Sequence, residues 1–348
     1  MTLIKLWGIP TVQELVDLGI MVFRQKNVRG TFKPHLAVKF RSDEGELLTF
    51  SVDTTRIPQK YQQPDAYLVT HAHSDHYGKS AMLSDLSVCS EKTATALEIR
   101  HERKYKGRTV KMGDSIDVNG VTIYTYANHH TVGSTAFYWE NDVGTRILVT
   151  GDVKDASSLP DCDVLITEAN YGDPGDTSCY FEDDLSGFRD IYEGNTSLAF
   201  GAYAFGKAQR AVELLRHFGY TGSIEMEEKS LALTRQLLDN AGELVPLGNS
   251  CDDSISIVPP WDLNKLSSHI SKYVMTGRSD YRYPSIQISD HLDACGLTKM
   301  VEDINPEFTV VYHPSGYRPE RFTSHLRQIG FNGVSIDKID NVLSNEFI

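Results

Sequence analysis

Three histidines and an aspartate fall within six consecutive residues of this chain, directly after the short apolar run 66–69. The segment reads His71-Ala72-His73-Ser74-Asp75-His76. Side chains two residues apart in an extended chain project to the same side, so His71 and His73 can bind one ion while Asp75 and His76 serve a neighbouring one. Imidazole and carboxylate ligands suit zinc, with manganese or iron as alternatives, and two such ions can activate water for attack on phosphorus or carbon. The segment predicts a hydrolase with two divalent metal ions.

Further ligands are expected where three other strand-like runs end. The runs are 121–126, 146–150 and 307–312, and the residues that follow them are His129 or His130, Asp152 and His313. An aspartate after an apolar strand can reach between two cations, so Asp152 is expected to bridge them. Four strands would then deliver ligands to one edge of the fold.

Several of these motifs resemble those of a known family. Residues 71–76, 130–134 and 150–152, in this order, look like the metallo-β-lactamase superfamily. Three more motifs are similar to those of its nucleic-acid-processing branch, the β-CASP nucleases: 163–172, 288–291 and the strand that ends at His313. The resemblance covers nearly the whole chain. It implies an α/β fold, namely a metallo-β-lactamase αββα sandwich with an inserted α/β β-CASP cap.

The resemblance also implies a role for the motif residues. One ion would be held by His71, His73, His130 and Asp152, and the other by Asp75, His76, Asp152 and His313. The family's spacing to Gly133-Ser134 favours His130 over His129. His291 would contact the scissile phosphate and protonate the leaving oxygen, and Glu168 would orient His291 and favour its charged form. Asp53 matches an early aspartate that supports the site. The residues expected to contact substrate are Tyr203, Lys207 and Ser134.

The stretch between Glu168 and His291 is too long for a loop and has its own pattern of strands and helices. Strands are predicted at 197–200, 254–258 and 273–277, and helices at 207–218, 228–238 and 265–269. This alternation implies a small parallel α/β unit inserted into the hydrolase. We therefore expect core segments at 1–185 and 286–348 and a cap at 186–285.

A turn of small residues at 201–206 precedes the helix expected from Lys207. Exposed backbone N–H groups beside Lys207 and Arg210 suit a phosphate, although an ordinary strand-to-helix turn would look the same. Residues 206–210 and 288–291 are similar to the DNA-ligase-associated and helicase-associated exonucleases of the branch. RNA 3′-end-processing members more often carry arginine after this glycine. The resemblance therefore favours DNA over RNA, and a DNA exonuclease in repair with a helicase or DNA ligase as partner.

Charge argues against a broadly basic surface, because the net charge is −13 over 348 residues. The basic stretch 100–108 and three arginines after His313 are local exceptions, although most charge runs are solvated faces. We expect a narrow binding track whose affinity falls steeply with salt. The alternatives left open are a ribonuclease in RNA 3′-end processing or decay, a small-molecule metallohydrolase and a non-catalytic scaffold.

The beginning of the chain lacks a signal-peptide pattern, and no apolar run reaches membrane-spanning length. We therefore expect a cytoplasmic protein with no membrane partner. The cysteines lack C-x-x-C spacing and are expected to be reduced thiols. They are Cys89, Cys162, Cys179, Cys251 and Cys295.

Overall fold

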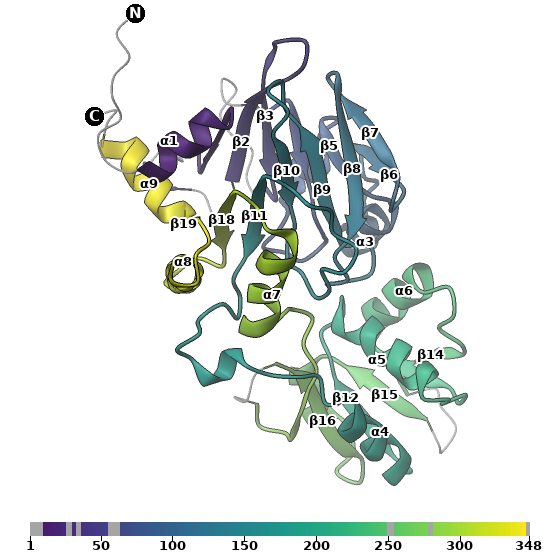
Figure 1. Cartoon of the computed structure of the whole chain (residues 1–348). Helices are drawn as coiled ribbons and strands as arrows, with labels where there is room; N and C mark the ends of the chain where they lie inside the picture. The colour runs from purple at the N-terminus through teal and green to yellow at the C-terminus, as the bar shows by residue number, and fades with distance from the viewer. Residues whose placement is uncertain are drawn as a thin grey trace, which may run out of the picture.

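The computed structural model describes residues 10–25, 30–32, 36–54, 63–248, 254–277 and 281–345. Within these ranges the chain forms three β-sheets with helices packed on them, a mixed α/β fold as the sequence predicts (Figure 1). Two sheets lie together in the upper part of Figure 1 and the third lies below them. Cys251 is outside the described residues, and the four other cysteines are free thiols.

The first sheet has six strands, which lie in the order of the chain. Neighbours from β1 to β3 are antiparallel, and those from β3 to β6 are parallel. The strands are β1 (Ile20–Phe23), β2 (Leu36–Arg41), β3 (Leu47–Val52), β4 (Ala66–Leu68), β5 (Ser87–Ser90) and β6 (Arg108–Val110).

The second sheet has seven strands in the order β19-β18-β11-β10-β9-β8-β7. Its antiparallel half runs from β7 to β10, and its parallel half joins β10, β11, β18 and β19. The strands are β7 (Ser115–Val118), β8 (Val121–Ala127), β9 (Thr135–Glu140), β10 (Arg146–Val149), β11 (Val164–Glu168), β18 (Phe308–His313) and β19 (Gly333–Ser335).

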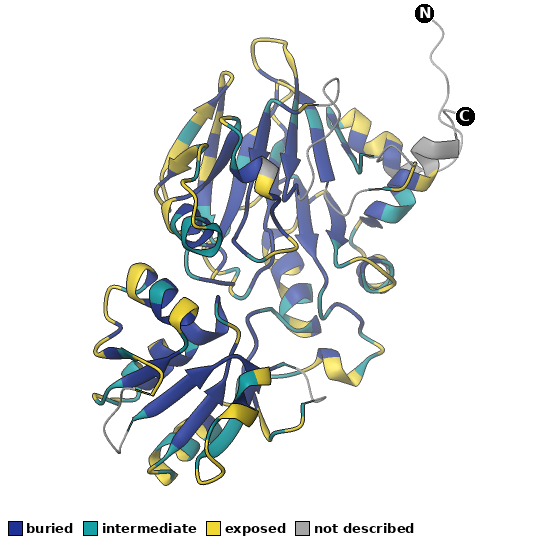
Figure 2. Cartoon of the chain, turned by 180° about the vertical axis from the view of Figure 1, so that it is seen from behind, coloured by how far each residue is buried: buried dark blue, intermediate teal, exposed yellow. Residues whose placement is uncertain are grey.

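A shared apolar core joins the facing sides of these two sheets. The rings of Phe40 and Phe50 in the first sheet contact Trp139 in the second, with ring centroids 5.7 and 5.4 Å from it. Alternate residues of β10 point to opposite sides: Ile147 enters this core, whereas Leu148 enters a second cluster on the outer face. Figure 2 shows the strands of both sheets largely buried. Because side chains alternate between the two sides of each strand, apolar residues are buried on both faces of the sheet.

Helices cover the two outer faces. Helices α2 (Lys79–Met82) and α3 (Glu91–His101) pack on the first sheet, and α7 (Ala294–Ile304) and α8 (Arg318–Gln328) pack on the second. Helices α1 (Pro10–Asp17) and α9 (Ile336–Asn345) both contact β1. The resulting order of helix, sheet, sheet and helix is consistent with an αββα sandwich.

The third sheet has six parallel strands in the order β14-β13-β15-β12-β16-β17. It forms the small parallel α/β unit that the alternation of elements predicts, and we call it the third-sheet unit. The domain boundaries at 186 and 285 stay a prediction. Its elements are α4 (Leu185–Gly194), β12 (Leu198–Gly201), α5 (Lys207–His217), β13 (Ile224–Met226), α6 (Glu228–Leu237), β14 (Leu244–Pro246), β15 (Ile255–Val258), η3 (Pro260–Lys265), β16 (Ser271–Thr276) and β17 (Ser285–Gln287).

One expected helix of this unit is wrong. Residues 266–269 are not helical; the turn lies earlier, in the 3₁₀ helix η3, which ends at Lys265, because Pro260 at its first position already has the φ angle that a helical turn needs. The sequence also gave no sign of β13, β14 or β17, which have only three residues each. Runs this short show no periodicity. A second 3₁₀ helix, η2 (Thr177–Cys179), links the sandwich to the third-sheet unit.

The third-sheet unit packs against the sandwich near the loop after β4. Leu233 and Leu237 of α6 share a buried cluster with Ala94 and Leu97 of α3, and Phe205 from the loop before α5 joins it. This contact brings the β12–α5 loop over the histidine-rich segment. In the part of the chain described, no helix has both the length and the apolar character to cross a membrane.

Candidate metal centre

The predicted ligands converge at one edge of the sandwich, from strands of both sheets. The histidine-rich segment follows β4 of the first sheet. In the second sheet, His130 follows β8, Asp152 follows β10 and His313 ends β18. Since these strand ends lie side by side, residues far apart in the sequence form one cluster of possible metal ligands.

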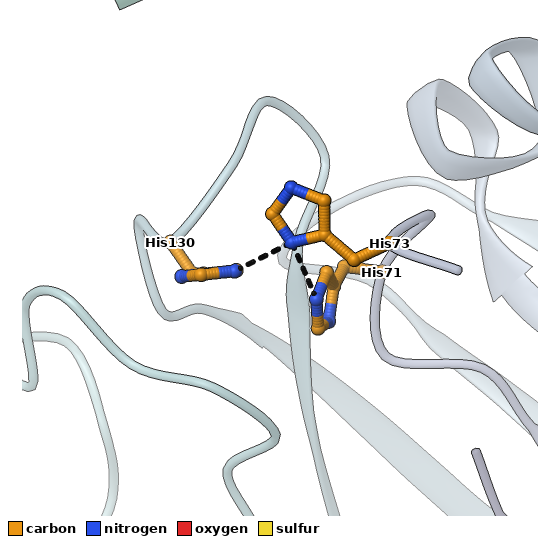
Figure 3. Close-up of side chains that lie close together, drawn as sticks. All are labelled: His71, His73 and His130. Atoms are coloured by element: carbon orange, nitrogen blue, oxygen red, sulfur yellow. Dashed lines mark hydrogen bonds between the residues drawn. The ribbon is translucent and has the colours of Figure 1, made fainter. Parts of the chain in front are cut away.

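Three imidazoles face one another at the centre of this cluster (Figure 3). The His73 Nδ1 atom lies 3.1 Å from His71 Nε2 and 3.0 Å from His130 Nε2. Nitrogen ligands of one tetrahedral zinc ion, each bonded at about 2.0–2.1 Å, are separated by about 3.3 Å. Burial lowers the pKa of His73 to about 4 and lowers the pKa values of His71 and His130 as well. All three rings are therefore neutral near pH 7, which is the form that binds a metal.

Hydrogen bonds on the far sides of the rings orient two of these nitrogens. His130 Nδ1 donates to the backbone carbonyl of Asp290 at 2.7 Å, so its Nε2 keeps a lone pair for the cluster. His71 Nδ1 lies 3.0 Å from the Thr70 hydroxyl. His73 Nε2 donates to the carbonyl of Phe205 over 3.3 Å. Such outer partners fix the tautomer of a ligand histidine.

A second group lies beside the first and shares Asp152 with it. The Asp152 Oδ2 atom lies 3.3 Å from His76 Nε2, 3.6 Å from His130 Nε2 and 3.8 Å from His71 Nε2. On the other side of His76, Asp75 and His313 complete a group whose ligand atoms lie within 4.8 Å of one another. Asp152 therefore lies where a bridging ligand between two cations is expected.

Asp53 lies next to this second group and contacts His76. Its Oδ2 atom accepts from His76 Nδ1 at 2.8 Å, which turns His76 Nε2 toward Asp152. Burial disfavours a charge on His76, but the carboxylates of Asp152 and Asp53 outweigh that effect and raise the pKa of His76.

Two buried atoms in this group make no hydrogen bond to any of the residues described. They are His76 Nε2 and Asp152 Oδ1. A buried polar atom without a hydrogen bond costs about 1–3 kcal/mol, and a cation would relieve both. Imidazole and carboxylate donors together suit a divalent transition metal. The buried clusters can therefore hold metal, and their shared aspartate is consistent with two ions.

Glu168 and His291 form the expected pair next to the cluster. His291 Nδ1 lies 2.9 Å from Glu168 Oε1, and the fully buried carboxylate also accepts from the backbone N–H groups of Val153 and Asn170. Burial opposes a charge on His291, but the attraction of Glu168 and nearby aspartates is stronger, and the pKa of His291 is raised. The His291 ring lies 4.5 Å from the His130 ring. His291 thus lies at the edge of the ligand cluster and forms a possible ligand group with His130 and Asp152.

Two cavities meet at this site. One, which we call the site cavity, has a volume of about 580 Å³ and is lined by His73, His130 and His291 together with aromatic side chains. The other, of about 1010 Å³, lies between the sandwich and α5. The two share His130, Ser289 and Asp290 in their linings, so they are neighbours beside the cluster.

The residues expected to contact substrate differ in what their surroundings allow. Tyr203 is 43% exposed and lines the site cavity. Lys207 is buried, and its ammonium lies 2.9 Å from Asp290 Oδ1 and 2.7 Å from the carbonyl of Ile288. Ser134 is also buried, and its hydroxyl donates to the Thr131 carbonyl. Lys207 also lines the site cavity, and Ser134 lines the other cavity, so the expected substrate contacts of both residues stay predictions.

The structure separates the two adjacent histidines. His129 is exposed, with φ at 56°, and belongs to none of the ligand groups, whereas His130 is buried in two of them. The left-handed residue reverses the chain so that only the second ring turns inward.

Several residues of the site cavity were missed by sequence reasoning. Arg100 donates to the Ala72 carbonyl at 2.9 Å, with its guanidinium 5.7 Å from the centre of the Phe205 ring. The sequence placed it only in a charged stretch. Trp261, Tyr281 and Lys229 also line the cavity, and no motif marks them.

No family model matches the chain. A probable DNA ligase of Opitutus terrae is 25% identical over 307 residues, which are 79% of this chain and 29% of that protein. An RNase J-like protein of Methanocaldococcus jannaschii is 24% identical over 222 residues, 54% of this chain and 52% of that protein.

A third relative is the DNA cross-link repair protein pso2/snm1 of Schizosaccharomyces pombe, 29% identical over 96 residues, 26% of this chain and 17% of that protein. The chain thus spans about half or less of each relative's length. A crystal structure of a protein of unknown function from Enterococcus faecalis shares the fold, with a TM-score of 0.57, 11% identity and coverage of 84% of this chain and 93% of that one. The names of these three relatives fit the β-CASP branch of the metallo-β-lactamase superfamily, which the motifs of this chain resemble.

Proposed function

We propose that this protein is a metal-dependent nuclease that hydrolyses phosphodiester bonds, most specifically a DNA exonuclease in repair. The observation that carries the proposal is the contact between two arrangements: a cluster of ligands built around Asp152, and the Glu168–His291 pair 2.9 Å apart at its edge. A small-molecule hydrolase would also need metal ligands. Hydrolysis of a small molecule would not explain why the Glu168–His291 pair lies beside two adjacent cavities.

The chain's ligand groups fit two divalent ions, which we take to be zinc, with manganese possible. When bound, such ions supply a nucleophilic water near neutral pH and neutralise charge on the phosphate. The first ion would be held by His71, His73, His130 and Asp152, and the second by Asp75, His76, Asp152 and His313. Thr70, Asp53 and the Asp290 carbonyl keep the ligand rings oriented.

His291 is the group that would contact the phosphate and donate a proton to the leaving oxygen. Its raised pKa keeps the ring charged closer to neutral pH, and its side chain is 21% exposed, so a substrate in the site cavity can reach it. Glu168 is buried and receives two backbone N–H groups, which hold its carboxylate in place against His291 Nδ1. The pair leaves His291 Nε2 as the atom that faces substrate.

The third-sheet unit would act as the β-CASP cap, with its boundaries at 186 and 285. The strand would lie between this unit and the sandwich, along the two cavities that meet at His130. The likeness to a probable DNA ligase over 79% of this chain supports DNA as substrate, and a ligase or helicase as the partner that provides targeting.

A ribonuclease in RNA 3′-end processing or decay is the second candidate. The likeness to an RNase J-like protein over 54% of the chain favours it. The same residues would do the chemistry, and the two functions would differ only in whether the site accepts a 2′-hydroxyl.

The test is cleavage of end-labelled single-stranded DNA and RNA of identical sequence, with zinc or manganese added. Preference for DNA, with a ladder that starts at one end, is expected from a repair exonuclease. Preference for RNA would move the protein to RNA processing. Cleavage of neither strand would contradict the proposal.

The His291→Ala variant can be compared with the wild type in the same assay. We expect it to lower the cleavage rate by roughly 10²–10⁴-fold, as for loss of a general acid, while the metal content measured by mass spectrometry stays unchanged. His269→Ala is the matched control, because His269 is exposed and lines neither cavity. Wild-type turnover in the His291 variant would exclude the assigned role.

A further inference from the structure

Two exposed aromatic side chains stand together at the mouth of the site cavity. Trp261 is 63% exposed and Tyr203 is 43% exposed, and their ring centroids lie 5.8 Å apart. Both line the cavity that His73 and His291 also line. Single exposed aromatic residues need no explanation, but a pair that continues the wall of a functional cavity forms a binding surface.

The fold holds these rings in place although they contribute little to the core. The Tyr203 hydroxyl lies 2.8 Å from the Tyr281 hydroxyl. Trp261 is in η3, whose Leu263 is fully buried against the end of β12. A Cβ atom on Gly201 would lie 2.7 Å from Leu263 Cδ1 and 3.1 Å from Pro260 Cα, so glycine is needed there for η3 to pack this closely. The rings are therefore preorganised, which lowers the entropy cost of binding a flat partner.

Charges in the same cavity indicate what that partner is. Arg100 is held by the Ala72 carbonyl at the cavity wall, and Lys229 is exposed near the start of α6. Two aspartates also line the cavity: Asp290 is paired with Lys207, and Asp75 is one of the proposed metal ligands. Cations beside exposed aromatic faces suit a partner that carries both negative charge and flat rings. A nucleotide strand has both, in alternation.

The two ring planes are tilted by 52° to each other. We infer that Trp261 and Tyr203 form a platform on which an unpaired nucleobase stacks against one ring and contacts the other with its edge, while the adjoining phosphate lies at His291. A base offers its face to a protein ring only when no neighbouring base covers it, which excludes bases inside a duplex. The inference rests on the proposed nuclease function and narrows its substrate to a single-stranded segment or end. Tyr203 thus acts through its ring, rather than through a hydrogen bond to phosphate.

The platform can be tested by binding, without cleavage, in protein kept with a chelator. The probe is a fluorescein-labelled DNA strand of about ten nucleotides, within the range covered by single-strand-binding folds, and a blunt duplex of the same sequence. Anisotropy gives the affinities. Tryptophan emission, measured in a Trp7→Phe background, reports contact between the strand and Trp261. Trp139 is buried in the core, so Trp261 is the ring that responds.

We expect the single strand to quench Trp261 and to bind more tightly than the duplex. Trp261→Ala and Tyr203→Ala should each weaken single-strand binding about tenfold, and Trp261→Phe should weaken it less, since it keeps an aromatic face. The control is Tyr124→Ala, because Tyr124 is 45% exposed on β8 and lines neither cavity. Unchanged affinity in both platform variants, or equal affinity for the duplex, would overturn the inference.

Strands in which one nucleotide lacks its base locate the stacked position. At that position, loss of the base should weaken binding to the wild type but not further weaken binding to Trp261→Ala. Additive losses at every position would contradict stacking on Trp261.

The outcomes also separate this inference from the proposed function. If the protein cleaves nucleic acid and the platform variants bind as the wild type does, the proposed nuclease function stands and the platform is rejected. If single-strand binding depends on Trp261 but the metal-loaded protein cleaves nothing, the platform stands and the proposed nuclease function is rejected.

Discussion

At the residue scale, the candidate site depends on which ring nitrogen of each histidine is already bound. His130 Nδ1 donates to a carbonyl and His76 Nδ1 to Asp53, so in both rings Nε2 remains for a metal. Spacing in the sequence can propose these histidines as ligands, but it cannot say which atom faces inward. The outer hydrogen bonds decide this, and their loss typically lowers metal affinity.

Asp53→Asn tests that idea at one atom. Both oxygens of Asp53 accept hydrogen bonds, from Thr70 N–H on one side and from His76 and the Tyr312 hydroxyl on the other. An asparagine NH₂ group would face a donor whichever way it turned. We expect metal affinity to fall roughly 10–100-fold in a competition titration against a chelating dye.

The matched control for that variant is Asp65→Asn. Asp65 accepts from the Thr49 backbone N–H at 2.7 Å and belongs to no ligand group. Its metal affinity should equal that of the wild type, and a loss as large as in the Asp53 variant would point to a general destabilisation.

At the element scale, the β12–α5 loop is what ties the third-sheet unit to the metal centre. The carbonyl of Phe205 accepts from His73, and the next residue, Gly206, has φ at 88°. A Cβ atom there would lie 3.1 Å from Thr131 Cγ2 and 3.3 Å from His73 Nε2. The phosphate-binding turn that the sequence suggested at this glycine stays a prediction. In the structure the glycine allows the close approach of two segments.

Gly206→Ala should therefore destabilise the protein. The strained backbone alone costs about 1–3 kcal/mol, and the close contact adds to it, so the free energy of unfolding in urea should fall by at least that amount. Gly194→Ala is the control, since Gly194 ends α4 and a Cβ atom there would meet nothing within 4 Å. Equal stability of both variants with the wild type would show that the loop does not need glycine.

At the scale of the whole molecule, bound metal should stabilise the fold, because its ligands come from loops of both sheets of the sandwich. Removing it leaves His76 Nε2 and Asp152 Oδ1 buried without hydrogen bonds to the described residues. Zinc at 100 times its dissociation constant should stabilise the fold by about 2.7 kcal/mol. We expect chelation to lower the melting temperature in calorimetry, and Asp152→Asn to lose most of this response. Identical melting curves with and without chelator would contradict the metal centre.

The net charge of −13 makes binding of a polyanion depend on few local cations. If Arg100 and Lys229 each neutralise one phosphate, the logarithm of the single-strand affinity should fall with the logarithm of salt with a slope of about −1.4, at about −0.7 per contact. Lys229→Ala should reduce the slope by about 0.7, whereas Trp261→Ala should leave it unchanged because it removes no charge. A slope that Lys229→Ala does not alter would exclude this lysine from phosphate binding.

The sequence by itself determined those features of the protein that depend on local patterns of residues. Apolar runs that end in His71, His130, Asp152 or His313 predicted strands with ligands at their ends, because a strand's period and the residue that follows it are both local. Lys207 to the end of α5 was predictable for the same reason, as its apolar stripe repeats at helical spacing.

Only the tertiary structure decided which side chains lie next to one another. Lys207 is expected from the sequence to contact phosphate, but only the fold shows that Asp290, 83 residues further along, lies within 2.9 Å of its ammonium. Trp261 looked like any tryptophan after two prolines until η3 placed it beside Tyr203 at the site cavity. Both outcomes depend on contacts between distant segments, and such contacts follow from the packing of whole elements, which no local pattern records.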